Sequence, residues 1–487
     1  MNAVIVGAGL SGLAAASILS SQGIKVTVIE KNNNIGGRAR VFHEKGYTFD
    51  MGPSWYLMPD MMERVFKISG QSTKSYFKLK KLNPSFDLYV GNNKISIKPE
   101  LSENFGILDS YEKDGYNNFL NYLEVCKSMY DKTVSKLLYK EFNGPMSMVS
   151  PSVIRTAMGI KITKSMKDLS ELYFKSTELR YLTQFSSVFL GGSPSTIPAV
   201  YSMVNYSIFK EGVFYPENGF GSLVDSLRKI AEDNGATFVI GSPVISLDIE
   251  NNIINNVRTA KARYNGDFFI FNADYHYVEQ ELLPKMYRNY NSKYWEKKKV
   301  SPSAVLAYIG LKGKPNLSHH TIFTGKSWDE HFNSIDNSLD KVPDNFSFYA
   351  ALRSYSNDNI APEGNSNLFI LIPVSTSYND NLKNREKLIK IALKRMEQAT
   401  GYNFNDNIDY IKYYGKSDFQ NDYNSFLGSA FGIAQTMQQT AGFRPSMRNK
   451  KIKNMFYAGQ FTHPGIGVPM AMISGEIVSA AVKNYSK

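Results

Sequence analysis

The chain has 487 residues, 43% of them hydrophobic and 21% charged, with a formal net charge of +12. Because one hydrophobic core rarely serves so long a chain, we expect two domains, and this composition excludes disorder on a large scale. The single cysteine, Cys126, excludes an intramolecular disulfide and indicates a reducing, cytoplasmic setting. The positive charge is spread along the chain without a nucleic-acid-binding signature, so we expect no nucleic acid partner and favour the anionic surface of a membrane.

The first 30 residues predict a strand, a glycine-rich turn, a helix and a second strand. The apolar run 3–6 is typical of a buried parallel strand, and residues 25–30 predict the next one. Such a turn lets the backbone approach a pyrophosphate at the helix N-terminus, and Glu30 can accept a hydrogen bond from a ribose hydroxyl. This context favours dinucleotide binding over a structural loop. The residues of the turn that we assign to the cofactor are Gly7, Gly9, Leu10, Ser11 and Gly12.

A second glycine-rich segment follows directly and separates FAD from NAD. Its glycine pair lets the backbone come close to a cofactor, and its arginine is a permanent planar cation suited to a diphosphate. The segment resembles the second glycine signature of flavin amine oxidases, which implies FAD; the alternative is a solvated turn. Its assigned residues are Lys31, Gly36, Gly37, Arg38 and Ala39.

Further motifs extend a resemblance along nearly the whole chain. They occupy residues 46–59, 212–221, 271–274, 319–323, 361–364, 443–445 and 457–470. Together they resemble the bacterial and archaeal type of phytoene desaturase, in the carotenoid desaturase branch of the flavin amine oxidase-like superfamily. The run Thr462-His463-Pro464-Gly465 is the most telling, because it is similar to a signature of carotenoid desaturases.

The resemblance implies an α/β fold with α+β insertions. A discontinuous Rossmann-type FAD-binding domain is expected from residues 1–70, 211–300 and 430–487. Residues 71–210 and 301–429 are then expected to form a substrate-binding, membrane-facing domain of a sheet plus a helical cap. Residues 120–210 look mainly helical, and some of their methionine and aromatic side chains are expected to line a tunnel for a long polyene.

Further FAD contacts are carried over from the family. The resemblance implies that the backbone of Val244, in a strand expected over 240–247, meets the adenine. It also implies contacts from Gly459, Gln460, Gly467 and Val468. Many relatives have an acidic residue where this chain has Gln460, and its amide can still donate and accept hydrogen bonds.

The resemblance implies FAD-dependent desaturation of phytoene towards lycopene. Expected partners are phytoene or a related carotene, the inner face of the cell membrane, and dioxygen or a quinone as electron acceptor; oligomerisation stays open. No transmembrane helix is expected, because Pro469 and Glu476 interrupt the apolar C-terminal run. The protein is thus expected to be cytoplasmic and peripherally bound to the membrane.

Few side chains are candidates for a direct role in the reaction. The flavin carries the reaction, so a dedicated residue need not exist; if one does, His463 and Glu476 are acid/base candidates because they flank the expected flavin contact. The six histidines show no spacing typical of a metal site, and adjacent His319 and His320 are expected to point to opposite sides of a strand.

Four other functions share this fold. A later carotenoid 3,4-desaturase, a carotenoid cis-trans isomerase and an amine oxidase would all use the same cofactor motifs. A non-enzymatic carrier of prenyl lipids would need no flavin, and the intact glycine motifs with Glu30 and Arg38 argue against it.

Overall fold

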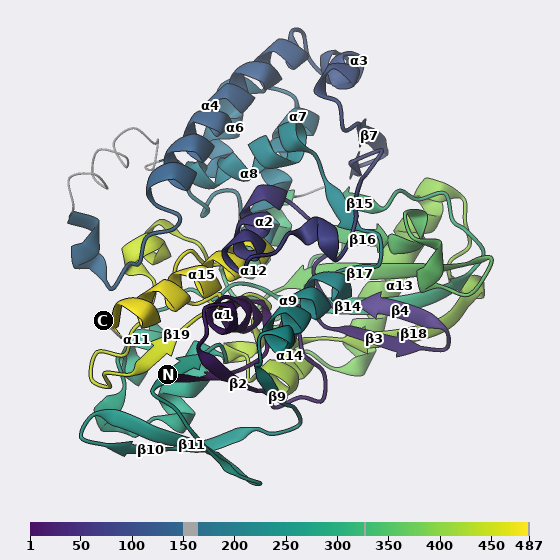
Figure 1. Cartoon of the computed structure of the whole chain (residues 1–487). Helices are drawn as coiled ribbons and strands as arrows, with labels where there is room; N and C mark the ends of the chain where they lie inside the picture. The colour runs from purple at the N-terminus through teal and green to yellow at the C-terminus, as the bar shows by residue number, and fades with distance from the viewer. Residues whose placement is uncertain (150–163, 326–327, 486–487) are drawn as a thin grey trace.

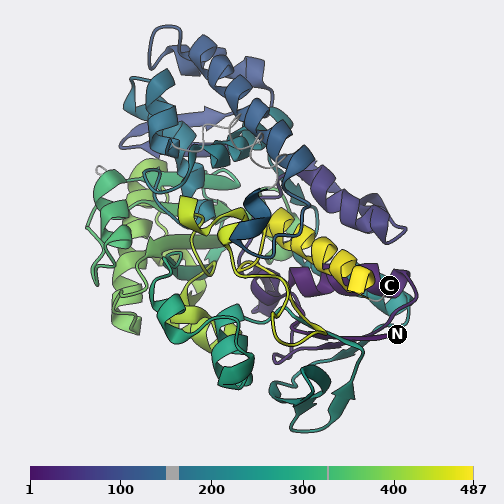
Figure 2. The same cartoon turned by 90° about the vertical axis from the view of Figure 1, so that its left-hand side faces the viewer.

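The computed structural model describes residues 1–149, 164–325 and 328–485. Two large sheets organise the chain (Figure 1). One has five parallel strands in the order β19-β13-β1-β2-β9, and the other has seven strands in the order β18-β14-β17-β16-β15-β6-β7. The two termini lie close together beside the five-stranded sheet (Figures 1 and 2).

Strands β1, β13 and β19 of the five-stranded sheet are buried on both faces because they are almost entirely apolar. In β1, Ala3 and Ile5 face one hydrophobic cluster while Val4 and Val6 face another. Helix α1 contains so many small residues that α15 packs closely on it: a Cβ at Gly475 would lie 2.6 Å from the Ser11 carbonyl oxygen. Bounds are β1 (Asn2–Val6), α1 (Leu10–Ser21), β2 (Lys25–Ile29), α9 (Gly221–Asp233), β9 (Thr237–Val239), β13 (Phe268–Phe271), β19 (Met455–Tyr457) and α15 (Val468–Tyr485).

The seven-stranded sheet is mostly antiparallel, with β15 and β6 as its parallel pair. Its central strands β14 and β17 pair from Ser303↔Val374 to Lys312↔Asn365, and nearly all their side chains are buried. Bounds are β6 (Phe86–Val90), β7 (Asn93–Ile97), β14 (Ser303–Lys312), β15 (His320–Thr324), β16 (Phe348–Leu352), β17 (Asn365–Val374) and β18 (Ile408–Tyr414), with α12 (Trp328–Asp336), α13 (Leu382–Thr400) and α14 (Lys416–Tyr423) nearby.

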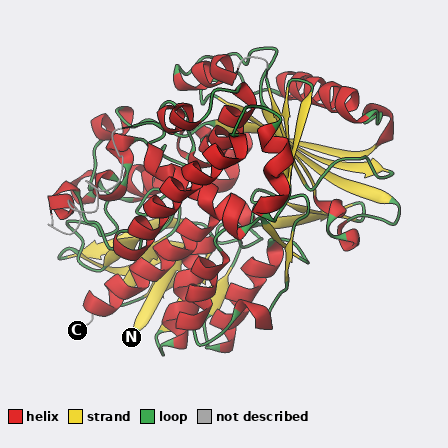
Figure 3. Cartoon of the chain, turned by 90° about the horizontal axis from the view of Figure 1, so that it is seen from above, coloured by secondary structure: helices red, strands yellow, loops and turns green. Residues whose placement is uncertain are grey.

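A helical group lies at the end of the molecule away from the five-stranded sheet (Figures 1 and 2). It contains α3 (Phe105–Asp109), α4 (Gly115–Lys136), α6 (Met166–Tyr173), α7 (Thr177–Gln184) and α8 (Met203–Tyr206). Seen from above, helices cover much of the strands (Figure 3). The remaining elements are β3 (Val41–Glu44), β4 (Tyr47–Asp50), α2 (Pro59–Ile68), β5 (Leu79–Lys81), β8 (Phe214–Pro216), β10 (Val244–Glu250), β11 (Ile253–Thr259), β12 (Arg263–Asn265), α10 (Tyr275–Tyr277) and α11 (Ser292–Glu296).

The predicted fold class is confirmed: a Rossmann-type α/β unit is combined with a second sheet and a helical cap. The residue boundaries of the two domains stay a prediction, and residues 150–163 of the expected helical segment lie outside the described part. The strand expected over 240–247 begins at Val244, because the chain bends at Gly241 and Pro243 cannot donate a backbone hydrogen bond to a sheet. Among the described residues, no helix is both long and apolar enough to cross a bilayer.

Candidate active site

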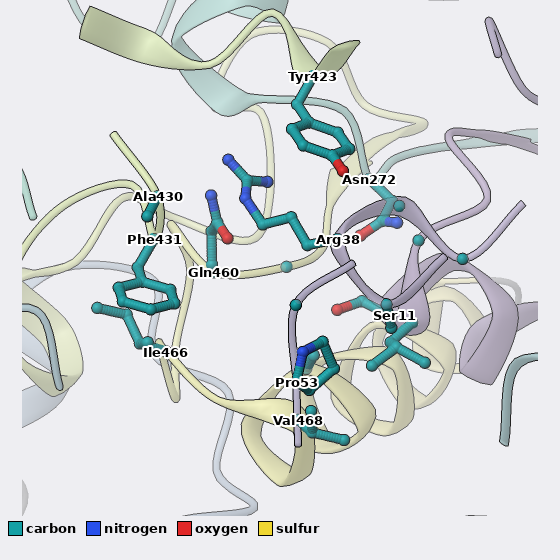
Figure 4. Close-up of a pocket in the computed structure, with 18 of the residues that line it drawn as sticks. Ser11, Arg38, Pro53, Asn272, Tyr423, Ala430, Phe431, Gln460, Ile466 and Val468 are labelled. Carbon is teal, nitrogen blue, oxygen red and sulfur yellow. The ribbon is translucent and has the colours of Figure 1, made fainter. Parts of the chain in front are cut away.

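A cavity of about 430 Å³ lies where the carboxyl ends of the parallel strands meet the second sheet. Its wall is formed by segments from both sheets and by the loops around β19 and α15. Figure 4 shows Arg38 and Gln460 together in its centre, Pro53 next to Val468 on one side, and Phe431 next to Ile466 on another. The carboxyl ends of parallel strands are where open α/β sheets bind ligands.

The glycine turn after β1 leaves no room for larger side chains. A Cβ at Gly12 would lie 2.2 Å from the carbonyl oxygen of Gly7, and one at Gly9 would lie 2.8 Å from Nδ2 of Asn272. Gly7 has a φ of +103°, which glycine adopts without strain. Helix α1 begins at Leu10 with no side-chain cap and no acidic residue in its first turn, so its N-terminus suits an anion.

Glu30 directly follows β2 and is buried against the turn. Its carboxylate accepts hydrogen bonds from the backbone N–H of Ala8 at 2.8 Å and of Asn32 at 2.9 Å. The side chain is 6% exposed and borders the cavity. These bonds fix the carboxylate at the edge of the cavity, and its remaining lone pairs can still accept a hydrogen bond from a ribose hydroxyl.

The guanidinium of Arg38 is buried and has no carboxylate partner among the described residues. Its guanidinium donates to the Ser425 hydroxyl at 3.2 Å and lies 4.8 Å from the ring centre of Tyr423. Gln460 can turn its amide oxygen to within 3.2 and 3.3 Å of two guanidinium nitrogens. Nε has no hydrogen-bond partner, and no ion pair joins Arg38 to a carboxylate in the described ranges. Burial lowers the pKa of Arg38, and an unpaired buried cation of this kind suits a diphosphate.

A buried carboxyl group lies near this cation. Burial raises the pKa of Asp274 to about 6, although Arg38 opposes the rise. Asp274 caps α10 by accepting from the backbone of Tyr277 at 3.2 Å. This carboxyl group therefore holds the loop after β13, which also carries Asn272, at the edge of the cavity.

The loop between β19 and α15 closes the cavity from the C-terminal side. Gly459 and Gly467 have φ of +112° and +118°, so the backbone turns sharply at both ends of the loop. The Gly459 N–H donates to the Ser474 hydroxyl at 2.9 Å, which fastens the loop to α15. Helix α15 then begins at Val468, beside Pro53 (Figure 4).

The structure brings most of the predicted cofactor residues to one cavity. It is bordered by Gly7, Gly9, Leu10, Ser11, Glu30, Lys31, Gly36, Gly37, Arg38, Ala39, Val244, Gly459, Gln460, Gly467 and Val468. Gly12 lies behind the turn, where it packs the helix onto the strand. Their roles towards the cofactor stay predictions.

The two acid/base candidates do not border the cavity. His463 Nε2 pairs with the carbonyl oxygens of Leu137 and Leu138 at 3.2 and 3.0 Å, and burial lowers the pKa of His463 to about 4. Glu476 forms an ion pair with Arg64 at 2.7 Å. Both side chains face away from the expected chemistry, and their catalytic assignment stays a prediction without support from geometry.

The expectation that His319 and His320 point to opposite sides of a strand is wrong. Their ring centres lie 4.4 Å apart, with the ring planes at 72°. The reason is that β15 begins at His320, so His319 lies outside the pleat that would alternate the two side chains.

Several cavity residues had no cofactor role assigned from the sequence, although Asn272 and Pro53 lie within the motifs 271–274 and 46–59. Asn272, Tyr423 and Phe431 border the cavity together with Pro53 (Figure 4). Asn272 directly follows β13, the neighbour of β1 in the parallel sheet, so its position after an apolar strand was an available signal. Tyr423 and Phe431 carry no such signal.

Comparison with known proteins identifies the family. The profile of the flavin containing amine oxidoreductases matches residues 10–483. The chain belongs to this family. It is 36% identical to a carotenoid 3,4-desaturase of Haloarcula japonica over 98% of this chain and 97% of that protein, and 29% identical to a phytoene desaturase of Phycomyces blakesleeanus over 99% and 85%. A solved oxidoreductase from Methanosarcina mazei shares the fold, with a TM-score of 0.65, 17% identity, and coverage of 99% of this chain and 100% of that one.

These findings place the protein in the carotenoid desaturase branch, as an FAD-dependent oxidoreductase that acts on CH–CH groups. The residues present fit the cofactor. The glycine turn forms a cradle that a Cβ would fill, and the buried guanidinium of Arg38 has an unpartnered Nε. The described residues contain no cluster of side chains suited to a metal ion.

Proposed function

We propose that this carotenoid desaturase acts on a C40 carotenoid bound in the cavity, with the polyene next to FAD. The observation that carries the proposal is that one continuous cavity joins the glycine turn to a mainly apolar wall. That wall contains Met51, Leu57, Met58, Phe189, Leu190, Met203, Ala304, Leu306, Phe369, Leu371, Phe431, Ile466 and Met470. An apolar wall of this kind holds a hydrocarbon and excludes water from the reacting carbons.

Two substrates fit this proposal. The sequence motifs imply phytoene, converted towards lycopene. The 36% identity to a carotenoid 3,4-desaturase over nearly the full length of both proteins favours a later, more unsaturated carotenoid. Either reaction needs the same cofactor and the same dry cavity.

The cofactor-binding roles that we propose are supported by the position of these residues around the cavity. We assign the diphosphate to the turn after β1 and to Arg38, the ribose to Glu30, and the adenine to the backbone at Val244. The loop that contains Gly467, with Val468 at the start of α15, is assigned to the flavin ring. Bound FAD supplies a two-electron acceptor; the chain's own residues orient it and keep water away.

Absorption spectroscopy tests the function. The FAD-loaded protein is mixed anaerobically with liposomes that contain phytoene, or a more unsaturated carotenoid such as lycopene. Bleaching of the flavin band with formation of a longer polyene supports desaturation, and the carotenoid that reacts faster identifies the substrate. Protein that binds no FAD contradicts the proposal and favours a lipid carrier. Reduction by primary amines alone favours an amine oxidase, and isomerised product without net oxidation favours an isomerase.

The other expected partners are proposals of the same kind. Reduced FAD must pass its electrons on, and both dioxygen and a membrane quinone would serve. A carotenoid dissolves in membranes, so we propose that the protein docks on a membrane surface. Re-oxidation rates with each acceptor and co-sedimentation with anionic vesicles check these two points.

A further inference from the structure

A short chain of polar groups interrupts the apolar wall of the cavity. The Ser54 hydroxyl lies 2.7 Å from the Tyr349 hydroxyl, which lies 2.6 Å from Nδ1 of His320. Ser54 and Tyr349 border the cavity, and His320 is fully buried behind them. The His320 ring stacks on Trp55, with the ring centres 4.3 Å apart, so its orientation is fixed. The three hydrogen-bonding groups therefore lead from the cavity into the protein.

The last of the three hydrogen-bonded groups, His320, is an imidazole that is neutral in the resting protein. Burial, the neighbouring His319 and the cation of Arg353 lower the pKa of His320 well below its usual value. A neutral imidazole keeps one nitrogen lone pair free to accept a proton. The same surroundings disfavour imidazolium, so a proton received there is readily passed on. Tyr215, whose hydroxyl donates to Asp50 at 2.6 Å, packs against the His319 ring.

A continuation towards the surface lies beside His320. His319 Nδ1 contacts the hydroxyl of Ser356, which is half-buried. The Nε2 atoms of both histidines are buried and have no hydrogen-bond partner in the described part of the chain. The two rings pack against each other. The pair thus lies between the cavity wall and a residue near solvent.

The hydrogen-bonded series Ser54, Tyr349 and His320 begins next to the expected position of the flavin. Ser54 follows Pro53, which lies beside Val468 at the start of α15 (Figure 4). On the proposed function, this part of the cavity holds the carbons that react. Desaturation there must remove a second hydrogen as a proton, and the hydroxyl groups of Ser54 and Tyr349 lie on this wall.

We propose that Ser54, Tyr349 and His320 form a proton relay that takes the second hydrogen of each desaturation step from the substrate. This inference rests on the proposed function. One hydrogen of the carotenoid would leave as hydride, with the electron pair of its C–H bond, and bound FAD would accept it. The neighbouring C–H bond then gives its proton to the Ser54 oxygen, and its electron pair forms the new C=C bond. Ser54 passes its own proton to Tyr349, which passes its own to His320 Nδ1, so that His320 carries the one proton released.

A weak base is sufficient for this step. A C–H bond next to a carbon that has lost hydride is strongly acidic, so the relay mainly has to be in place and close to the substrate. Positioned proton transfer of this kind typically contributes about 10²–10⁴-fold to a rate. Loss of the relay is therefore expected to slow the chemical step far more than it weakens binding.

Tyr349→Phe tests the relay, because it removes one hydroxyl and keeps the ring. Tyr308→Phe is the matched control: this buried tyrosine of the same sheet donates to the Met51 carbonyl at 2.6 Å and does not border the cavity. Formation of the longer polyene, in the anaerobic reaction of the FAD-loaded protein with the carotenoid, is followed by stopped flow in H2O and D2O. We expect wild type and Tyr308→Phe to react more slowly in D2O. Tyr349→Phe should be about 100-fold slower or worse, with FAD affinity unchanged.

A double mutant and a spectroscopic measurement separate the relay from a packing role. His320→Gln combined with Tyr349→Phe should be no slower than the slower single variant, because both break one chain. Nitrogen NMR of labelled histidines in the resting protein should show His320 with an unprotonated Nδ1 whose signal shifts in Tyr349→Phe. Additive losses, or a protonated Nδ1 at rest, would overturn the relay.

The outcomes distinguish this inference from the function on which it rests. Wild-type protein that leaves FAD oxidised with both carotenoids contradicts the proposed function, and the relay with it. Wild-type formation of the longer polyene, together with a Tyr349→Phe rate of polyene formation within about threefold of the control, contradicts the relay alone, since a positioned proton acceptor is worth much more.

Discussion

Replacing the buried cation Arg38 by methionine tests the cofactor site most directly. A charge-assisted hydrogen bond is worth about 1.5–3 kcal/mol, so Arg38→Met should weaken FAD binding roughly 10- to 150-fold. The apoprotein should keep or gain stability, because the guanidinium is buried with an unpartnered Nε and without a carboxylate ion pair among the described residues. A residue that binds FAD and one that only holds the fold therefore give opposite results.

The assay combines two titrations of the same protein. FAD affinity is measured by quenching of flavin fluorescence, and apoprotein stability by urea unfolding. Arg395→Met is the matched control: its guanidinium donates to the Thr324 carbonyl at 2.8 Å, away from the cavity. It should lose stability and keep FAD affinity. If Arg38→Met instead lost several kcal/mol of stability with unchanged FAD affinity, the assignment of Arg38 to the diphosphate would be wrong.

Three further predictions concern packing, charge and pH. Gly12→Ala places a Cβ 2.2 Å from a backbone carbonyl oxygen, so it should cost about 1–3 kcal/mol of apoprotein stability and abolish FAD binding. The control Gly106→Ala has open space around the new Cβ and should leave the stability measured by urea unfolding unchanged. Glu476→Gln should keep the turnover rate and lose less than about 1 kcal/mol, because its ion-pair partner is half exposed; a tenfold loss of turnover would restore Glu476 as an acid/base candidate. His331 is buried, with both ring nitrogens bonded to backbone and its pKa lowered from 6.5 to about 4. Well above pH 6.5 the imidazole is neutral in both states, so it does not change the free energy of unfolding. As the pH falls, His331 binds a proton in the unfolded state but stays neutral in the folded state. The free energy of unfolding should therefore decrease by about 2 kcal/mol by pH 5. His331→Gln should flatten this part of the pH dependence of the unfolding free energy. An unchanged slope would contradict the lowered pKa of His331 in the folded protein.

The parts of the site that could be predicted are those that local rules determine. The apolar run 3–6 and the glycine turn after it specify a strand, a close backbone approach and a helix start within a dozen residues. Glu30 could be placed because it ends the next strand of the same parallel sheet. In each case neighbours in the sequence are also neighbours in space.

The parts that could not be predicted depend on contacts between distant segments. The Ser425 hydroxyl reaches Arg38 across 387 residues, and no local pattern marks it. His319 was misplaced because alternation applies only inside a strand, and the first strand residue is His320. The register of β15 on β16 decides which residue lies within the pleat, and the sequence pattern alone does not determine that register.

The contrast between His463 and Tyr349 shows why nearness to a motif in the sequence is a poor guide to catalytic groups. His463 was chosen because it lies four residues before Gly467, at the expected flavin contact. The loop turns through glycines with positive φ, and its imidazole is directed towards the carbonyl oxygens of Leu137 and Leu138 instead. Tyr349 lies more than a hundred residues from every residue assigned to FAD from the sequence, yet β16 carries its hydroxyl to the cavity wall. Where a cofactor supplies the redox chemistry, the groups that handle protons need only border the same cavity. A buried polar chain in an apolar wall is therefore a stronger indication of such a group than proximity to a motif.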